Sequence, residues 1–305
     1  MKTVSLIIPY FGKMNEYQLF AIRQLSLVSC LDINLIIDRD FDELSLSMNG
    51  VNILDSKDCF IEDNCFGLKL SELYEFPYKL CDLKPFFNLI FKFEHKKYYS
   101  FCDLDCIYNP SVLRTLLSDI PDRFIGGENG HFMIFDFLSL FKVQNDFIVK
   151  ALTFKKSNDI DLFVGGRHFA LDEYLFLHKV LSELDSNSEI FWNRDFFKPF
   201  LDVDYKNLIP VNWFESDLSF SIDSILVDME ISDSSYIHLQ KRKLSGPLLN
   251  NNTITFNKLG HVVLNTSENK KIYLSYTAIF RCRCFWERVK FRFRHHGLSK
   301  RPSFT

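Results

Sequence analysis

Short apolar runs alternate with a helical segment at the start of this sequence, and that alternation constrains the fold more than any other feature. The runs Val4–Pro9, Asn34–Asp38 and Val51–Leu54 are short and apolar, and residues 15–30 between the first two have apolar side chains at helical spacing. A strand–helix–strand order predicts a parallel sheet that helices cover. We therefore predict an α/β fold with a Rossmann-type sheet.

Two aspartates follow the next predicted strand. This strand is expected over Tyr98–Phe101, after a short helix for which Asp82 is the predicted N-cap, with Pro85 in the first turn. The outer side chains of an extended Asp-x-Asp segment lie on one face, where two carboxylates repel each other unless a cation binds between them. We therefore predict a divalent metal site at Asp103 and Asp105.

The Asp-x-Asp pattern is common here, because it occurs five times, and position must decide its meaning. Only the pairs Asp38/Asp40 and Asp103/Asp105 directly follow a strand-like run. In open α/β sheets ligands bind beyond the carboxyl ends of the strands, so both pairs lie where a ligand is expected. The alternative interpretation of either pair is a simple strand cap that solvates a turn.

A second pair of acids is a candidate for proton transfer. Asp172 and Glu173 lie in the first turn of the helix predicted over Ala170–Leu184. Carboxylates are favoured there by the helix dipole, so capping is one interpretation. The other is that one of the two is a general base.

One histidine lies where an anion site would be completed. His238 is on a strand-like segment that leads into Lys241, Arg242 and Lys243. A lone histidine is most often a core residue, but beside several cations at a strand end it can also bind an anion or a metal.

The composition excludes several classes of protein. Hydrophobic residues make up 47% and charged residues 25% of the chain, as in globular proteins and unlike disordered ones. We find no apolar run near the roughly 18 to 20 residues of a membrane-spanning helix, and no signal-peptide pattern. The eight cysteines include no Cys-x-x-Cys pair, so neither a zinc site nor a disulfide framework is expected. These features favour a cytoplasmic protein.

The C-terminal segment differs in charge from the rest of the chain. Eight basic residues and one acid lie from Arg281 onward, a net charge of +7, which leaves −10 for residues 1–280. Residues 276–296 predict an amphipathic helix with a basic rim, typical of a helix on an anionic membrane surface. The alternatives are docking on its own domain and nucleic-acid binding, which the acidic remainder disfavours. Before this helix, residues 252–265 predict a small β-hairpin.

Several stretches together resemble a known family. In order and spacing the sequence is similar to bacterial surface-polysaccharide glycosyltransferases with a GT-A fold, a family found among O-antigen and capsule enzymes. The resemblance implies a GT-A-like domain over residues 1–245, followed by the hairpin and basic helix over 246–305. The matching stretches are IIPYFGK at 7–13, YKLCDLKPFFNLIF at 78–91, FCDLDCIY at 101–108, GHFMIF at 130–135, LDEY at 171–174 and IHLQKRK at 237–243.

The resemblance also implies roles for individual residues on the donor side. Asp103 and Asp105 would form the metal-binding motif, with His238 as the third ligand of Mn²⁺ or Mg²⁺. The other implied donor residues are Pro9, Tyr10 and Asp38 in the nucleotide pocket, Asp82 and Lys84 at the border of the donor, and Lys241 and Arg242 at the diphosphate.

On the acceptor side the resemblance implies fewer residues. Glu128 and His131 would lie near the transferred sugar or the acceptor, and Asp172 or Glu173 would be the base. The implied reaction is sugar transfer, with inversion, from a nucleotide-diphosphate sugar, a UDP-sugar being favoured, to a lipid-linked or polyprenyl-linked glycan at the inner face of the cytoplasmic membrane.

Two other functions remain open at this point. A sugar nucleotidyltransferase shares the layered α/β core and the metal carboxylates, but it usually carries a glycine-rich basic loop after the first strand, and Tyr10-Phe11-Gly12-Lys13 is a poor version of that loop. A non-catalytic, membrane-associated assembly protein would keep the fold without turnover.

Overall fold

The main sheet contains seven strands in the order β3-β2-β1-β4-β7-β6-β8. The structure is a computed structural model, and it describes residues 3–14, 16–38, 50–128, 130–165, 168–169, 171, 176–197, 199–201, 218–221, 225–226, 235–238, 253–256 and 262–263. The strands of the main sheet are β1 (Val4–Tyr10), β2 (Leu31–Ile37), β3 (Val51–Asp55), β4 (Tyr98–Cys102), β6 (Phe124–Gly126), β7 (Phe132–Asp136) and β8 (Phe191–Asn193).

The sheet is parallel on one side and mixed on the other. Strands β1 to β4 run parallel to one another, whereas β7 runs antiparallel to both β4 and β6. The sequence prediction of an α/β fold with a GT-A-like, Rossmann-type mixed sheet is therefore confirmed, and β4 is the strand at which the direction changes.

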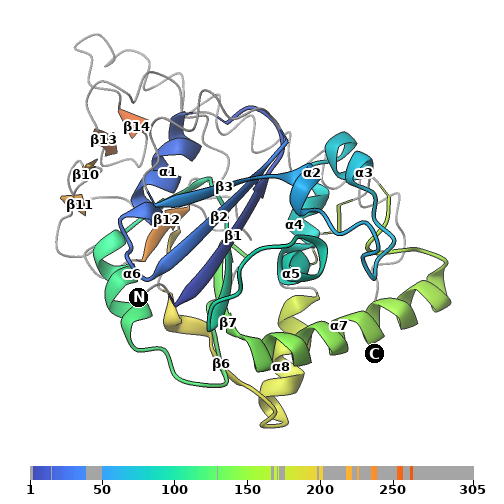
Figure 1. The fold of residues 1–305 in the computed structure, drawn as a ribbon. Coiled ribbons are helices and arrows are strands. Elements are labelled where there is room, and N and C mark those ends of the chain that lie inside the picture. Colours follow the sequence, from blue (N-terminus) through green and yellow to red (C-terminus); the bar gives the residue numbers. More distant parts are fainter. Residues whose placement is uncertain are drawn as a thin grey trace, which may run out of the picture.

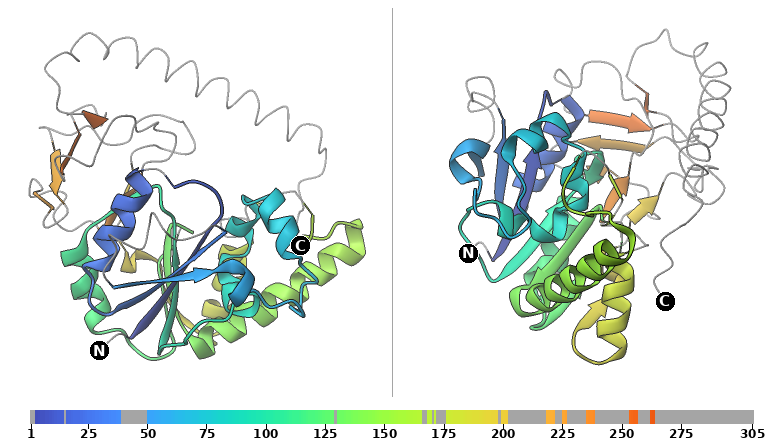
Figure 2. Two further views of the ribbon diagram at one scale, coloured as in Figure 1. Left: turned by 45° about the horizontal axis from the view of Figure 1, so that its top comes forward. Right: turned by 90° about the vertical axis from the view of Figure 1, so that its right-hand side faces the viewer.

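Helices cover both faces of this sheet (Figures 1 and 2). One face carries α1 and α6, and the other carries α4, α5, α7 and α8. Strand β1 shows why: the side chains of Leu6 and Ile8 pack under α1, and that of Ile7 packs on the opposite core, as the two-residue period of a strand requires. The helices are α1 (Glu16–Ser26), α6 (Pro110–Ser118), α4 (Lys79–Asp82), α5 (Phe87–Ile90), α7 (Phe137–Asn158) and α8 (Leu177–Ser186).

Side-chain caps fix where two of these helices begin. Asn109 accepts a hydrogen bond from the Val112 N–H at 3.2 Å, and Pro110 occupies the first turn of α6. Asp136 accepts from the N–H of Leu138 at 3.0 Å at the start of α7. The shorter helices are α2 (Ser56–Cys59), α3 (Leu70–Glu75), η1 (Lys84–Phe86) and η2 (Arg194–Phe196).

Two small sheets lie beside the main one. In the first, β12 (Tyr236–His238) pairs antiparallel with β5 (Cys106–Tyr108) and parallel with β9 (Pro199–Leu201). The second has the order β11-β10-β13-β14, and in it β13 and β14 pair antiparallel, as expected for a hairpin. Its strands are β10 (Leu218–Ser221), β11 (Ile225–Leu226), β13 (Thr253–Phe256) and β14 (Val262–Val263), so it joins residues from both sides of the boundary drawn at 245.

Three local predictions from the sequence are wrong. Asp82 is the last residue of α4, where its carboxylate binds another segment instead of capping a helix. The segment between Asp103 and Asp105 is not extended, because the chain bends there between β4 and β5. Helix α8 begins at Leu177 and not at Ala170. In each case a tertiary contact or a turn overrides the local pattern.

Within the described ranges, no helix has both the length and the apolar character needed to cross a bilayer. The basic amphipathic helix predicted over residues 276–296 lies outside the described residues.

Candidate functional site

Segments from three parts of the chain meet at the carboxyl end of β4. Asp103 and Asp105 lie in the bend between β4 and β5, and the Asp103 N–H donates to the carbonyl of His131, just before β7, at 2.8 Å. His238, at the end of β12, lies opposite Cys106 of β5 in antiparallel register. Strand pairing thus brings two acids and two histidines to one place.

The side chains of these residues form two groups that share one histidine. Donor atoms of Asp103, His131 and His238 lie within 4.8 Å of one another, as do those of Asp105, Cys106 and His238. The rings of His131 and His238 stack with centroids 3.6 Å apart and planes at 30°, and His238 Nε2 lies 3.4 Å from Asp105 Oδ2. His238 is therefore the centre of the cluster.

The cluster is buried on its histidine side and open on its aspartate side. His131 and His238 are 8% and 2% exposed, whereas the side chains of Asp103 and Asp105 are 24% and 53% exposed. A ligand from solvent can therefore reach the carboxylates while the imidazoles form the back wall.

A buried lysine partly neutralises the cluster. Lys84 Nζ lies 2.6 Å from Asp103 Oδ1 and donates to the carbonyl of Gly130 at 2.8 Å. The lysine is itself held in place, because the Tyr99 hydroxyl donates to the Lys84 carbonyl. Sequence reasoning placed Lys84 near the donor but did not reveal this ion pair.

The protonation states suit the binding of a cation. Burial by itself raises the pKa of Asp105, but the hydrogen bond and positive charge of His238 outweigh it, so that this pKa is lowered overall. Burial, with the nearby positive charges of His238 and Lys84, holds the pKa of His131 well below its usual range. At neutral pH the cluster therefore offers the Asp105 carboxylate and the neutral imidazole of His131, the forms that bind metals.

The donor set fits a divalent metal ion. Ligand oxygens and nitrogens lie about 2.0 to 2.2 Å from such an ion, so two ligands are at most about 4.4 Å apart, and donor atoms within 4.8 Å of one another need move only a little to share one. Burial raises the pKa of Cys102 to about 12 and that of Cys106 well above its usual value, so both thiols stay protonated. The cluster is thus a carboxylate–imidazole site.

The residues predicted for the nucleotide pocket lie at the same sheet edge. Pro9 and Tyr10 end β1, and Asp38 follows β2, so all three lie at carboxyl ends of parallel strands. Asp38 Oδ1 accepts from the Gly12 N–H at 3.0 Å, and this hydrogen bond ties the two loops together. The Tyr10 hydroxyl accepts from Gln18 at 2.7 Å.

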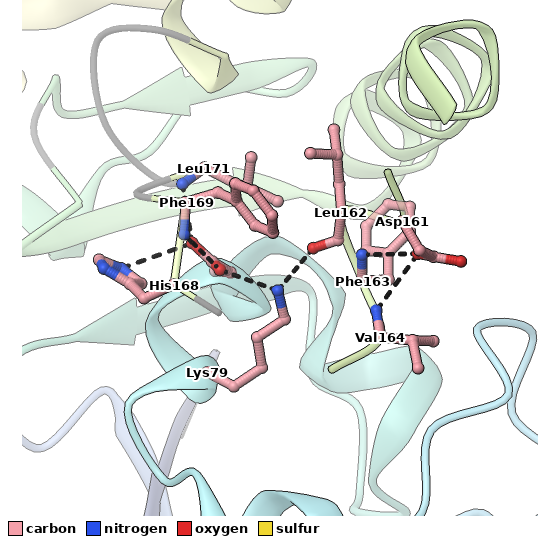
Figure 3. A network of polar contacts seen from close by, with 9 residues as sticks. Lys79, Asp161, Leu162, Phe163, Val164, His168, Phe169 and Leu171 are labelled. Carbon is pink, nitrogen blue, oxygen red and sulfur yellow. Dashed lines mark hydrogen bonds and ion pairs between the residues drawn. The ribbon is translucent and has the colours of Figure 1, made fainter. Parts of the chain in front are cut away.

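Asp82 lies in a separate, fully buried network (Figure 3). Its carboxylate pairs with Lys79 Nζ at 3.0 Å and accepts from the Phe169 N–H at 2.9 Å and the Leu171 N–H at 3.0 Å. Lys79 also donates to the Leu162 carbonyl at 2.6 Å. The pair therefore anchors the chain between α7 and α8, and sequence reasoning did not identify Lys79.

A second anchor fixes the backbone at Glu128. His178 Nε2, on α8, donates to the Glu128 carbonyl, and Trp192 Nε1 donates to the Gly127 carbonyl at 2.8 Å. Gly127 has φ +100°, and a Cβ there would lie 2.6 Å from the Phe132 carbonyl oxygen. A Gly-Gly pair such as Gly126-Gly127 indicates a turn in a sequence, but it does not reveal the side chains that hold the turn.

Four of the predicted site residues lie outside the described residues: Asp172, Glu173, Lys241 and Arg242.

The fold and the site define a mixed α/β protein with a carboxylate–imidazole cluster at the carboxyl edge of its sheet. The chain belongs to the family described as a family of unknown function (DUF6625), which matches residues 6–263. No curated protein matches this chain.

Solved structures of one protein are similar to part of the chain. The apo-form glycosyltransferase GlyE of Streptococcus pneumoniae TIGR4 has a TM-score of 0.35 and 14% identity over 64% of this chain and 46% of GlyE. A second GlyE structure has a TM-score of 0.34 and 12% identity over 60% of this chain and 43% of GlyE. This chain spans less than half of the length of GlyE, and the fold and site described above rest on its own geometry.

Replacing Asp82 by Asn is expected to destabilise the fold. The variant leaves the Lys79 ammonium buried without its counter-charge, which in other proteins lowers the free energy of unfolding by about 3 to 5 kcal/mol. Glu189→Gln is the control, because its pair with Lys142 is exposed and such pairs contribute about 0 to 1 kcal/mol. Urea unfolding followed by circular dichroism measures both, and equal losses would contradict the assigned role.

Replacing His178 by Gln is expected to reduce the acid sensitivity of the fold. Burial lowers the pKa of His178 below its ordinary value of 6.5. Between the folded-state pKa and 6.5 the unfolded chain binds more protons, so this group lowers stability as the pH falls through that window. Urea unfolding at pH 7 and pH 5 should show a smaller loss for the variant than for the wild type. A loss of the same size would show that His178 is not responsible.

Proposed function

We propose that this protein is a metal-dependent glycosyltransferase, which moves a sugar from a nucleotide-diphosphate donor to a hydroxyl of a lipid-linked glycan in surface-polysaccharide synthesis. The observation that carries the proposal is the cluster of Asp103, Asp105 and His238 at the carboxyl edge of the sheet. Ligands of open α/β sheets bind at that edge. The family resemblance of the sequence points to the same chemistry.

The donor diphosphate is the natural occupant of the open side of the cluster. Asp103, Asp105 and His238 would hold a Mn²⁺ or Mg²⁺ ion, which would supply Lewis-acid stabilisation of the charge developing on the leaving group. The Lys84 ammonium, 2.6 Å from Asp103, adds positive charge on the same side. Lys241 and Arg242 follow His238 closely in sequence, which suits contacts to the same diphosphate.

The nucleoside part of the donor would lie over the ends of β1 and β2. Pro9, Tyr10 and Asp38 belong to these ends, and the Asp38–Gly12 hydrogen bond holds the loops in a fixed relation. We assign these residues to the nucleotide pocket and favour a UDP-sugar as the donor.

The transfer itself needs a base and a positioned acceptor. The acceptor hydroxyl attacks C1 of the sugar, the bond from C1 to the diphosphate oxygen breaks, and the nucleoside diphosphate leaves. We assign the acceptor proton to Asp172 or Glu173, and this single displacement inverts the configuration at C1. Glu128, whose backbone His178 holds, would contact the sugar or the acceptor.

Metal-dependent nucleotide binding is the first expected result. Calorimetric titration of the full chain with UDP, GDP and CMP should show that one nucleotide binds in the presence of Mn²⁺. Asp105→Ala should weaken that binding at least about tenfold, or about 1.4 kcal/mol, because it removes a metal ligand. Asp122→Asn is the control, since its exposed side chain pairs with Lys97 just before the amino end of β4, the end opposite the cluster. Folded protein that binds none of the nucleotides would contradict the proposal.

We further propose that the basic C-terminal segment holds the enzyme on the inner face of the cytoplasmic membrane, beside a polyprenyl-linked acceptor. Eight basic residues from Arg281 onward favour anionic lipid by about 1 kcal/mol for each residue near the surface. Deleting residues 278–305 should therefore abolish sedimentation with anionic vesicles. The far-UV circular dichroism spectrum of the shortened protein should still be that of a folded protein. Unchanged vesicle binding by the shortened protein would rule out this role for the tail.

A further inference from the structure

We propose that His131 is a further protein ligand at the Asp103, Asp105 and His238 site, and that the site therefore selects a first-row transition-metal ion over Mg²⁺ and Ca²⁺. The inference rests on the proposed metal-dependent function and deepens it by naming the class of ion. It gives His131 a role different from the contact with sugar or acceptor that the family resemblance implies.

The backbone delivers His131 to the cluster. The Asp103 N–H donates to the His131 carbonyl at 2.8 Å, so the ladder between β4 and β7 continues one step past Cys102 and Phe132. The two side chains therefore leave neighbouring strands at the same level. This contact depends on main-chain pairing and not on the rotamer of a long side chain.

The distances fit a shared ion. One donor atom each from Asp103, His131 and His238 lie within 4.8 Å of one another. Two ligands on one ion, each about 2.1 Å from it, lie about 3 to 4.2 Å apart. A small contraction of the cluster is enough to bring all three donors to bonding distance, and Asp105 Oδ2 lies beside them, 3.4 Å from His238 Nε2.

Burial favours a metal ligand over a residue that contacts substrate. His131 is only 8% exposed and its ring lies against that of His238 at 3.6 Å. The ring of Tyr236 closes another side, with centroids 6.1 Å apart. A sugar has little access to such a ring, whereas an ion entering between the more exposed carboxylates meets it directly.

Because Lys84 partly neutralises Asp103, the two imidazoles determine which divalent ion the site prefers. Its ammonium lies 2.6 Å from Asp103 Oδ1, so it takes up part of the negative charge that would attract any divalent cation. Mg²⁺ and Ca²⁺ bind mainly through charged oxygen ligands, whereas Mn²⁺, Fe²⁺, Co²⁺ and Zn²⁺ also bind imidazole nitrogen. A site with a neutralised carboxylate and two imidazoles therefore favours the second group.

The discriminating variant is His131→Phe, which keeps an aromatic ring to stack on His238 but has no nitrogen donor. His95→Phe is the matched control, because it makes the same substitution at a histidine that packs against Phe93 and Phe137, outside the cluster. Isothermal titration of the full chain with Mn²⁺, Co²⁺ and Mg²⁺, without nucleotide, measures the dissociation constants. We expect the wild type to bind Mn²⁺ and Co²⁺ at least tenfold more tightly than Mg²⁺. His131→Phe should weaken Mn²⁺ and Co²⁺ binding at least tenfold, and His95→Phe less than twofold.

If the His131→Phe variant folds poorly, a spectroscopic measurement on the wild type tests the same inference. With ¹⁵N-histidine-labelled protein, added Zn²⁺ should shift ring nitrogens of both His131 and His238. A shift at His238 alone would overturn the inference.

The outcomes separate the inference from the function on which it rests. If Asp105→Asn weakens Mn²⁺ binding and His131→Phe does not, His131 is not a ligand and the metal-dependent function stands. If the folded wild type binds no divalent ion, both fail. A wild type that prefers Mg²⁺ would overturn the proposed selectivity.

Discussion

The antiparallel pairing of β7 with β4 is the constraint on which the site depends. Had β7 run parallel to its neighbour, its first residues would lie at the opposite edge of the sheet, far from Asp103. Because it runs antiparallel, His131 enters β7 beside the point where β4 ends. The bend after β4 lets β5 leave the main sheet and pair with β12, which brings His238 to the carboxylates.

Two buried lysines then balance the charges that this arrangement concentrates. Lys84 neutralises Asp103 at the mouth of the cluster, and Lys79 neutralises Asp82 under the chain that leads to α8. Both lysines come from the short helical stretch between β3 and β4, so one segment serves the metal-type cluster and the anchor of a neighbouring loop. Their separate partners explain why two lysines so close in sequence are not equivalent.

The strands of the sheet could be predicted from the sequence more completely than the contacts within the cluster. The strands β1, β2, β3 and β4 were predictable because each is a short apolar run, and Asn109-Pro110 marked the start of α6 by local chemistry. Asp103, Asp105 and His238 were chosen as metal ligands partly from family resemblance. The stacking of His131 on His238 was not predictable, because it depends on strand order and register between segments far apart in the chain.

Because β12 is short, an ion bound at the cluster would affect the stability of its pairing with β5. His238 belongs to the three-residue strand β12, which pairs with β5 and β9, while Asp103 and His131 lie next to the ends of the central strands β4 and β7. An ion bound by both would act as a cross-link that closes a long loop of the chain. Part of its binding energy would then appear as stability of the β5–β12 pairing, so an occupied site would stabilise that pairing.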